Sequence, residues 1–413
     1  MCSDKTFLFD FSNGSITYTE LLQDLNKTQT FPKYLKPQTF YECFKNIILA
    51  SISQEEIVLL DSDFSEAEIE NLTGFSALEL QSQVYEKKCQ EIKSVSQLIE
   101  LVQNATENFK ITLFTSGTTG TPKKVSHNIK SLTRFLKKST LHEQSVWGFA
   151  YNPTHMAGVQ VFLQALLNKN SIVKLFGLER TEIFNQIQNH NITHISATPT
   201  FYRLLLPVEN TFNSVIRLTC GGEKFDSKML AELTKMFPNA KITNVYASTE
   251  AGTLFASKED LFVVKDAFAN SVKIKNNELL LHKSLLGQSQ QINLDNDWYN
   301  TGDLVEIISE NPLSFKFIAR KNEMINVGGY KVNPTEVEEV IRSIAQVKDV
   351  RVFGKSNSIL GNIICAEIVA NSQMTEKEIR DFLKTKLQQF KIPRLIKFTD
   401  KLQFTRTGKT SRK

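Results

Sequence analysis

Short apolar runs alternate with amphipathic stretches of helical period between residues 110 and 249. A short apolar run bounded by turn residues indicates a buried strand, and apolar residues at a period near 3.6 indicate a helix. The predicted strands are 111–114, 146–151, 172–176, 194–197, 215–218 and 242–246. Helices are predicted from about residue 128, at 156–167, at 181–190, after Pro199 and at 227–237. Strands that alternate with helices at this spacing predict a doubly wound, mostly parallel sheet.

The pattern changes to paired strands after Gly252. Hairpins are predicted at 271–283, around two asparagines, and at 304–318, around an Asn-Pro pair, because these residues favour tight turns. Residues 1 to about 105 are predicted to form a reduced companion subdomain of mixed type.

A small α+β domain is predicted from about residue 323. Asn333 and Pro334 mark the start of its first helix, and Thr375 with Glu378 forms a capping box at the start of its second. The predicted fold class is therefore α/β. It has a large N-terminal domain with doubly wound, mostly parallel sheets and a β-rich subdomain, followed by the small C-terminal α+β domain.

Composition and charge exclude several classes of protein. The 413 residues are 41% hydrophobic and 23% charged, as in ordinary globular enzymes. The formal net charge is +5, and residues 391–413 alone contribute +7, but no nucleic-acid-reading motif accompanies them. The five cysteines are scattered without a Cys-x-x-Cys pair, which argues against a disulfide framework and a structural zinc site. We find neither a signal peptide nor an apolar run of the ~20 residues that cross a bilayer, so the expected location is cytoplasmic.

Residues 113–124 read Leu-Phe-Thr-Ser-Gly-Thr-Thr-Gly-Thr-Pro-Lys-Lys and follow a predicted strand. Such a loop can surround phosphate oxygens with backbone N–H groups and hydroxyls, and its lysines add positive charge. It is not a Walker A loop, because no Gly-Lys-Ser/Thr follows the first glycine at the required spacing. From composition alone, a flexible surface turn is an equally good interpretation.

This loop resembles the signature phosphate loop of the adenylate-forming superfamily, which comprises acyl-CoA and aryl-CoA synthetases, peptide-synthetase adenylation domains and luciferases. The resemblance continues through six blocks in the family's order: 246–250 (YASTE), 299–304 (YNTGDL), 320–325 (RKNEMI), 327–332 (VGGYKV), 334–338 (PTEVE) and 405–409 (TRTGK). Six ordered blocks are very improbable as unrelated turns.

The resemblance implies a nucleotide site. Tyr246 would offer a flat face to adenine, and Asp303, which we expect in a Thr-Gly-Asp turn, would accept the ribose hydroxyls. The residues that the family would place around the nucleotide are Thr115, Ser116, Gly117, Thr118, Thr119, Gly120, Lys123, Gly221, Gly222, Glu223, Tyr246, Asp303 and Arg320.

Catalytic roles are implied for Thr249, Glu250 and Lys409. Glu250 follows a predicted strand, where a carboxylate suits Mg²⁺ that bridges phosphates, and Thr249 would contact the α-phosphate. Lys409 would stabilise the charge that builds at the phosphorus under attack. Without the other blocks, Glu250 would be interpreted as a surface residue and Lys409 as part of a basic tail. His155 resembles the His-x-x-Gly near the family's acid pocket, and a structural histidine is an equally good interpretation.

The family's hinge corresponds to 320–322, with Asn322 as the pivot, because asparagine tolerates unusual backbone angles. The hinge would divide the chain into 1–319, which binds nucleotide and acid, and 323–413, which carries Lys409. Gly328 and Gly329 would let the pantetheine arm of CoA pass close to the backbone, although a plain turn explains them equally well.

The resemblance implies an AMP-forming acid–thiol ligase that uses ATP, Mg²⁺ and CoA on a small carboxylic acid. CoA is preferred because block 327–334 looks more like acyl- and aryl-CoA ligases, including succinylbenzoate-type enzymes, than like peptide-synthetase domains. A carrier protein with a phosphopantetheine thiol is the nearest alternative, and a non-catalytic nucleotide- or acyl-binding protein is a third interpretation. The chain departs from the family pattern at Ala247, Ala319 and Asn322, and is short before the phosphate loop. We expect these departures to affect the acid pocket and the kinetics rather than ATP binding.

Overall fold

The computed structural model describes residues 5–89, 91–115, 122–223, 227–327, 330–357, 361–371 and 374–402. The chain divides into two compact units. The first comprises Met1–Phe225, Ala231–Glu259 and His282–Tyr299, and the second comprises Asp226–Leu230, Asp260–Leu281 and Asn300–Lys413. Strands after residue 300 therefore group with the C-terminal residues, and the functional boundary at 320–322 stays a prediction.

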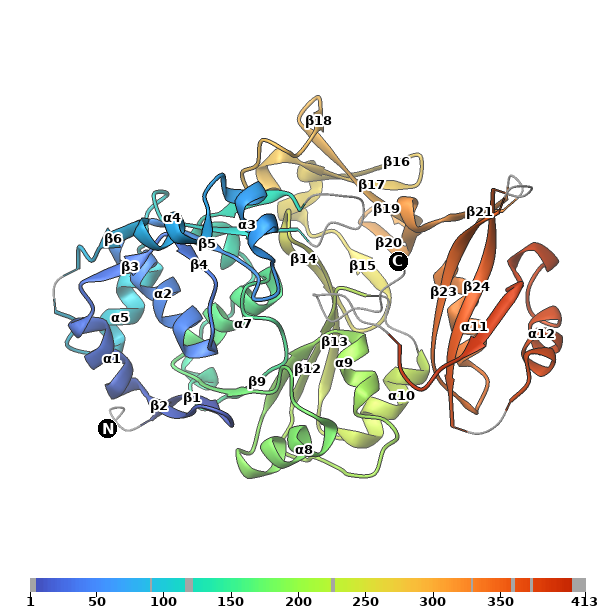
Figure 1. Cartoon of the computed structure of the whole chain (residues 1–413), viewed down its shortest axis with the longest axis horizontal. Helices are drawn as coiled ribbons and strands as arrows, with labels where there is room; N and C mark the ends of the chain where they lie inside the picture. Colours follow the sequence, from blue (N-terminus) through green and yellow to red (C-terminus); the bar gives the residue numbers. More distant parts are fainter. Residues whose placement is uncertain are drawn as a thin grey trace. The chain divides into compact units, whose positions relative to one another are not determined.

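An eight-stranded sheet forms the centre of the first unit (Figure 1). Its spatial order is β14-β13-β12-β11-β9-β10-β1-β2, and the six strands from β13 to β1 are parallel. The strands are β1 (Thr6–Asp10), β2 (Gly14–Thr17), β9 (Val146–Phe149), β10 (Ser171–Lys174), β11 (His194–Ala197), β12 (Arg217–Gly221), β13 (Lys241–Ser248) and β14 (Gly252–Ser257). The predicted doubly wound parallel arrangement is thus confirmed for the strands after residue 145.

A second sheet in this unit has the order β4-β5-β7-β8, with β8 antiparallel to β7. The sheet consists of β4 (Tyr34–Leu35), β5 (Glu56–Leu59), β7 (Lys110–Phe114) and β8 (Lys124–His127), and a separate pair is formed by β3 (Thr30–Pro32) and β6 (Val84–Glu86). The prediction that 111–114 continues the main sheet is therefore wrong. Its apolar pattern identifies a buried strand, but the partner strand is chosen by long-range packing.

The helices after residue 127 begin near their predicted positions, and no helix positions were predicted before it. The helices of this part of the chain are α1 (Tyr18–Lys27), α2 (Phe40–Ser53), α3 (Glu66–Thr73), α4 (Ala77–Ser82), α5 (Val95–Gln103), α6 (Ile129–Leu132), α7 (Met156–Leu166), α8 (Arg180–Asn189), α9 (Pro199–Leu204) and α10 (Ser227–Met236). Helix α6 consists of a single turn, with Thr133 as its C-cap.

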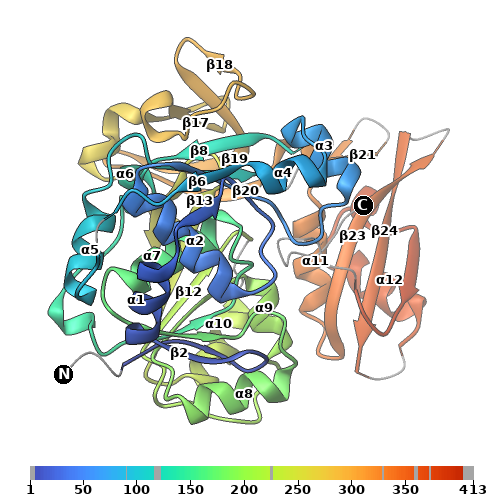
Figure 2. The same cartoon turned by 60° about the vertical axis from the view of Figure 1, so that its left-hand side comes forward.

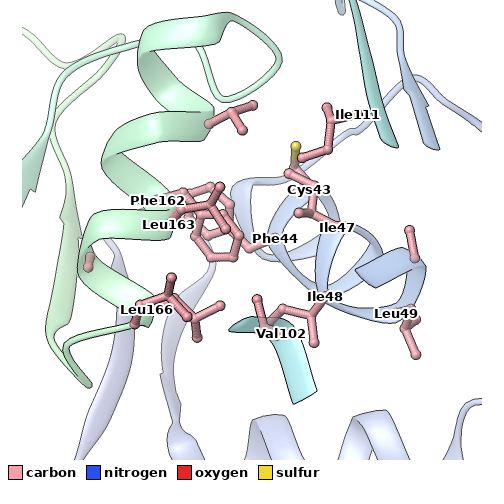
Figure 3. Packing of buried hydrophobic residues seen from close by; sticks show 14 of the residues in the cluster. Cys43, Phe44, Ile47, Ile48, Leu49, Val102, Ile111, Phe162, Leu163 and Leu166 are labelled. Atoms are coloured by element: carbon pink, nitrogen blue, oxygen red, sulfur yellow. The ribbon is translucent and has the colours of Figure 1, made fainter. Parts of the chain in front are cut away.

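One hydrophobic cluster joins both sheets of the first unit through α2 and α7 (Figure 3). Phe44 of α2 stacks on Phe162 of α7 with ring centroids 4.3 Å apart, and Ile111 of β7 belongs to the same cluster. Stacked aromatic pairs of this kind stabilise a core beyond their buried area. The predicted separate N-terminal subdomain is not formed, because β1 pairs in parallel with β10 and α2 packs in the shared core.

The second unit contains an antiparallel sheet of order β15-β20-β19-β17-β16. Its strands are β15 (Leu261–Val263), β16 (Val272–Lys275), β17 (Glu278–His282), β19 (Trp298–Glu310) and β20 (Leu313–Arg320), and β18 (Leu294–Asp295) pairs with the start of β19. Both predicted hairpins are confirmed. Asn276 and Asn277 have φ values of 54° and 60°, the left-handed conformation that a two-residue hairpin turn requires.

The C-terminal part of the second unit is the predicted α+β domain. Its strands are β21 (Ile325–Val327), β22 (Tyr330–Val332), β23 (Val347–Asn357), β24 (Gly361–Ala370) and β25 (Leu395–Phe398), of which β23 and β24 form a long antiparallel pair (Figure 2). Helices α11 (Pro334–Arg342) and α12 (Glu376–Lys384) begin at the predicted caps, and the capping box of Thr375 is formed. Their apolar faces share one core with the strands.

Candidate nucleotide and acid site

Three segments that carry predicted site residues follow strands β9, β12 and β13 of the eight-stranded sheet (Figure 1). The strand register pairs Phe149 with Ser196, Ala197 with Cys220, and Cys220 with Asn244. The strands therefore end at one edge of the sheet, and the segments after β9, β12 and β13 leave from that edge. Ligands of open α/β sheets bind at this carboxyl edge.

The base of the hydroxyl-rich loop is closed by a pair of hydrogen bonds. The Thr115 N–H donates to the Lys123 carbonyl, and the Lys123 N–H donates to the Thr115 hydroxyl, each at 2.9 Å. The two ends of the loop are thereby held together at the end of β7 and the start of β8. The predicted phosphate ligands Ser116, Gly117, Thr118, Thr119 and Gly120 lie outside the described residues.

Thr249 and Glu250 form the turn between β13 and β14. The side chain of Glu250 is half-buried, and within the described residues no ion pair engages its carboxylate. The described residues also contain no cluster of three or more His, Cys, Asp or Glu that could hold a metal. A single carboxylate fits Mg²⁺, which proteins bind through one or two carboxylates together with substrate phosphates.

The predicted adenine residues lie next to this turn. Gly221 pairs with Val245 in the parallel register, so the 221–223 segment lies beside Tyr246. The Glu223 carboxylate accepts hydrogen bonds from the backbone and hydroxyl of Thr200 and from Arg203. Glu223 therefore ties the segment after β12 to the first turn of α9.

His155 is the N-cap of α7, and its Nε2 lies 2.5 Å from Oδ2 of Asp61. Burial would raise the pKa of Asp61, but hydrogen bonds from His155, Asn152 and the Ser62 backbone outweigh it and hold this pKa below its usual value. An ionised carboxylate can only accept, so Nε2 of His155 carries a proton in this hydrogen bond.

Asp61 was not among the predicted site residues. The signal for it is present in the sequence, because Asp61 directly follows the apolar run 57–60 just as Glu250 follows the end of β13. A carboxylate at the end of a buried strand in this fold class is a candidate site residue.

Asp303 and Arg320 are paired in the second unit. Asp303 is 1% exposed, and its Oδ1 accepts a 2.8 Å hydrogen bond from Nε of Arg320 on the neighbouring strand. The expected turn at Asp303 is wrong, because this residue lies within β19 opposite Arg320. Asn322 lies in a 3-10 helix at Lys321–Glu323. Gly328, Gly329 and Lys409 lie outside the described residues.

Burial lowers the pKa of two histidines of the first unit to about 4, namely His127 at the end of β8 and His194 on β11. The hydrogen bond of His127 to the Thr249 carbonyl opposes this lowering, and Arg134 adds to it. The His194 ring contacts the Thr193 hydroxyl, and Arg217 lowers its pKa further.

We expect this pair of histidines to make the protein acid-sensitive. Between pH 6.5 and 4 these histidines bind protons in the unfolded chain but stay neutral in the folded chain. The free energy of unfolding therefore falls as the pH falls, by up to about 3 kcal/mol for each histidine. Urea denaturation midpoints measured from pH 7 to pH 4.5 test this. A His194→Gln variant should lose less stability over this range than the wild type, and an equal loss would contradict the assignment.

Comparison with known families shows the family to which the chain belongs. The AMP-binding enzyme family model matches residues 49–277, which is more than half of the chain, and the AMP-binding enzyme C-terminal domain model matches residues 336–409. The chain belongs to the AMP-binding enzyme family. The predicted superfamily is thereby confirmed, and the α/β fold agrees with it.

Relatives of this AMP-binding enzyme include 2-succinylbenzoate–CoA ligases. That of Staphylococcus epidermidis is 26% identical over 333 residues, covering 74% of this chain and 69% of the relative, and that of Listeria monocytogenes is 26% identical over 321 residues, covering 73% and 68%. Similar solved structures include o-succinylbenzoate CoA synthetase of Bacillus subtilis with the acyl-adenylate OSB-AMP (TM-score 0.72, 20% identity, 99% and 94% covered). ATP-bound MatB of Rhodopseudomonas palustris gives a TM-score of 0.75 at 16% identity, with 99% and 94% covered. Among the described residues, no helix combines the length and apolar character of a membrane span.

Proposed function

We propose that this AMP-binding enzyme activates a carboxylic acid with ATP as an acyl-adenylate and then transfers the acyl group to the thiol of CoA. The observation that carries the proposal is the link between the two halves of the nucleotide site. Nε2 of His127, on the strand β8 that follows the hydroxyl-rich loop, lies 2.8 Å from the carbonyl of Thr249. The strand that follows the loop is therefore tied to the Thr249–Glu250 turn within the first unit, and the phosphate and metal ligands of a single nucleotide need such a connection.

In the first step, a carboxylate oxygen of the acid attacks the α-phosphorus of ATP, and the bond to the β,γ-pyrophosphate breaks. The product is a mixed anhydride between the acid and AMP. Thr249 would contact the α-phosphate, and Lys123 would add positive charge near the loop. Glu250 would hold Mg²⁺, which neutralises phosphate charge when bound. The chain's contribution is positioning and charge stabilisation rather than covalent catalysis.

In the second step, the sulfur of the thiol attacks the acyl carbon, and AMP leaves with the oxygen that came from the acid. Gly328 and Gly329 would line the passage of the pantetheine arm. CoA is the thiol that the relatives' names support, because they are CoA ligases. The names of the relatives also place 2-succinylbenzoate first among the acids to be tested.

Incubation with ATP, Mg²⁺ and a panel of acids tests the proposal. The panel contains 2-succinylbenzoate, benzoate, a short and a long fatty acid, and malonate, each with CoA, with a phosphopantetheinylated carrier protein, or with neither. We expect pyrophosphate and AMP to appear in equal amounts with one acid and CoA. AMP that forms only with the carrier protein would overturn the choice of CoA. If no acid supported any release, non-catalytic binding would replace the proposed activity.

The Asp61–His155 pair gives a prediction for the acid site. Asp61→Asn removes the charge that holds the imidazole, and a hydrogen bond to a charged group contributes about 1.5–3 kcal/mol, so kcat/KM for the acid should fall about 10-fold to 100-fold. The KM for ATP should stay unchanged, because the pair acts on the acid side. The exposed neighbour Asp63 provides the matched control, Asp63→Asn. If Asp61→Asn changed the KM for ATP as much as it changed kcat/KM for the acid, a role in the acid pocket would be refuted.

A further inference from the structure

The Thr249–Glu250 turn is held by three donors from outside its own hairpin. The carbonyl oxygens of three consecutive residues each accept one hydrogen bond. Thr249 accepts from Nε2 of His127 at 2.8 Å, Glu250 from the Gly287 N–H at 2.7 Å, and Ala251 from Nη1 of Arg134 at 3.4 Å. Such a set of donors fixes the orientation of successive peptide planes, and hence of the side chains between them.

The groups that donate these hydrogen bonds are held in place by further hydrogen bonds among their own segments. Gln288 and Ser126 exchange two backbone hydrogen bonds, of 2.8 and 2.9 Å, which align Gly287 with β8. The second guanidinium nitrogen of Arg134 donates to the carbonyl of Leu285 at 3.1 Å. Arg134, which follows the short helix α6, therefore forms one frame around the turn together with the end of β8 and residues 285–288.

His127 is the central member of this frame. Its side chain is 1% exposed, and a carbonyl can only accept, so Nε2 carries the proton. Nδ1 lies 3.3 Å from the hydroxyl of Ser131, which holds the ring from the other side. Burial keeps the pKa of the ring at about 4, so the imidazole is neutral at ordinary pH and its tautomer is set by these two partners.

Gly287 has no side chain for a reason that involves the same ring. A Cβ at this position would lie 2.5 Å from Cε1 and 2.6 Å from Nε2 of His127. These distances are far below van der Waals contact, so any larger residue displaces the imidazole from the Thr249 carbonyl. The close approach of the backbone explains the glycine without any need for an unusual φ.

We propose that His127 is a positioning residue, which orients Thr249 and Glu250 for the activation step through the frame it forms with Gly287 and Arg134. This inference rests on the proposed function, because it assigns consequences to the contacts of Thr249 and Glu250 with ATP and Mg²⁺. His127 does not touch the nucleotide in this assignment. Its effect on the reaction is transmitted by the Thr249 carbonyl.

The test compares two substitutions of His127 in acid-dependent exchange of pyrophosphate into ATP. His127→Phe fills the site without a donor and should lower kcat about 100-fold, because a misplacement near 1 Å has an effect of that size. The KM for ATP should change less than about threefold, and the Mg²⁺ concentration for half-maximal rate should rise. His127→Gln places an amide N–H near the position of Nε2 and should restore kcat to within about 10-fold of wild type.

Two further variants separate positioning from loss of folding. His194→Phe removes another buried histidine, which lies against Trp147 and Thr193, and should destabilise the protein without lowering kcat at a temperature where it is folded. Gly287→Ala tests the frame without substituting His127 and should reproduce the defect of His127→Phe, whereas Gly354→Ala, which crowds Ile325 of the second unit, should not.

A wild-type kcat in His127→Phe and Gly287→Ala, or an equal loss in His194→Phe, would overturn the inference while leaving the proposed function intact. Absence of exchange in the wild type itself would instead contradict the proposed function.

Discussion

Lys409→Ala is expected to lower the rate of acid-dependent pyrophosphate exchange by about 10²–10³-fold, the usual effect of removing one preorganised group that stabilises transition-state charge. Negative charge builds on the oxygens of the α-phosphorus as the carboxylate attacks, and an ammonium beside them stabilises the transition state more than the bound substrates. The KM for ATP should therefore change little. Rates of exchange under saturating ATP and acid are the appropriate measurement.

The neighbouring basic residues provide the control for this variant. Arg412→Ala and Lys413→Ala remove the same charge from the same segment and should keep most of the activity. The second step, measured by adding CoA to preformed acyl-adenylate, should also survive in Lys409→Ala, because the thiol attacks the acyl carbon and no bond to phosphorus forms or breaks. Equal exchange rates in wild type and Lys409→Ala would remove this lysine from the mechanism.

Glu250→Gln should have the second large effect, again about 10²–10³-fold on exchange. Glutamine keeps the size of the side chain but removes the negative charge that a hard divalent cation prefers. The loss should be partly recovered at high Mg²⁺, because the phosphates of ATP still bind the ion. A titration of the exchange rate with Mg²⁺ distinguishes this from a folding defect.

The control for Glu250→Gln is Glu259→Gln, which makes the same change on an exposed residue shortly after β14. Its Mg²⁺ titration should coincide with that of the wild type. If the titration of Glu250→Gln also coincided with the wild type, Glu250 would not be a metal ligand.

Local signals in the sequence predicted the elements well because local physics determines them. The capping box of Thr375 and Glu378 and the two-asparagine turn at 276–277 depend only on residues within one turn of the chain. The apolar runs likewise located β9 to β13, whose parallel arrangement follows from the helices between them.

Pairing between distant strands could not be predicted in the same way. The run 111–114 has the same apolar character whether it pairs with β5 or with β9, and only the packing of α2 between the two sheets distinguishes these arrangements. Asp303 is a similar case. Thr-Gly-Asp is compatible with a turn, but the ladder between β19 and β20 extends the strand and places Arg320 opposite.

The residues of the candidate site also fall into those that local sequence predicted and those that depend on distant contacts. Thr249, Glu250 and Tyr246 were predicted because they belong to a recognised block at the end of a strand. His127 and Asp61 were not predicted, and the contacts that make them candidates, with the Thr249 carbonyl and the His155 imidazole, each join residues more than ninety positions apart. Contacts of this kind become visible only once the fold has been built.

Isotope transfer from the acid to AMP tests the central claim most directly. The acid is labelled with ¹⁸O in its carboxylate and incubated with the enzyme, unlabelled ATP, Mg²⁺ and CoA, and the products are analysed by mass spectrometry. Attack of the carboxylate on the α-phosphorus predicts that each AMP carries one ¹⁸O and that pyrophosphate carries none. Unlabelled AMP, or label in inorganic phosphate formed together with ADP, would contradict the account.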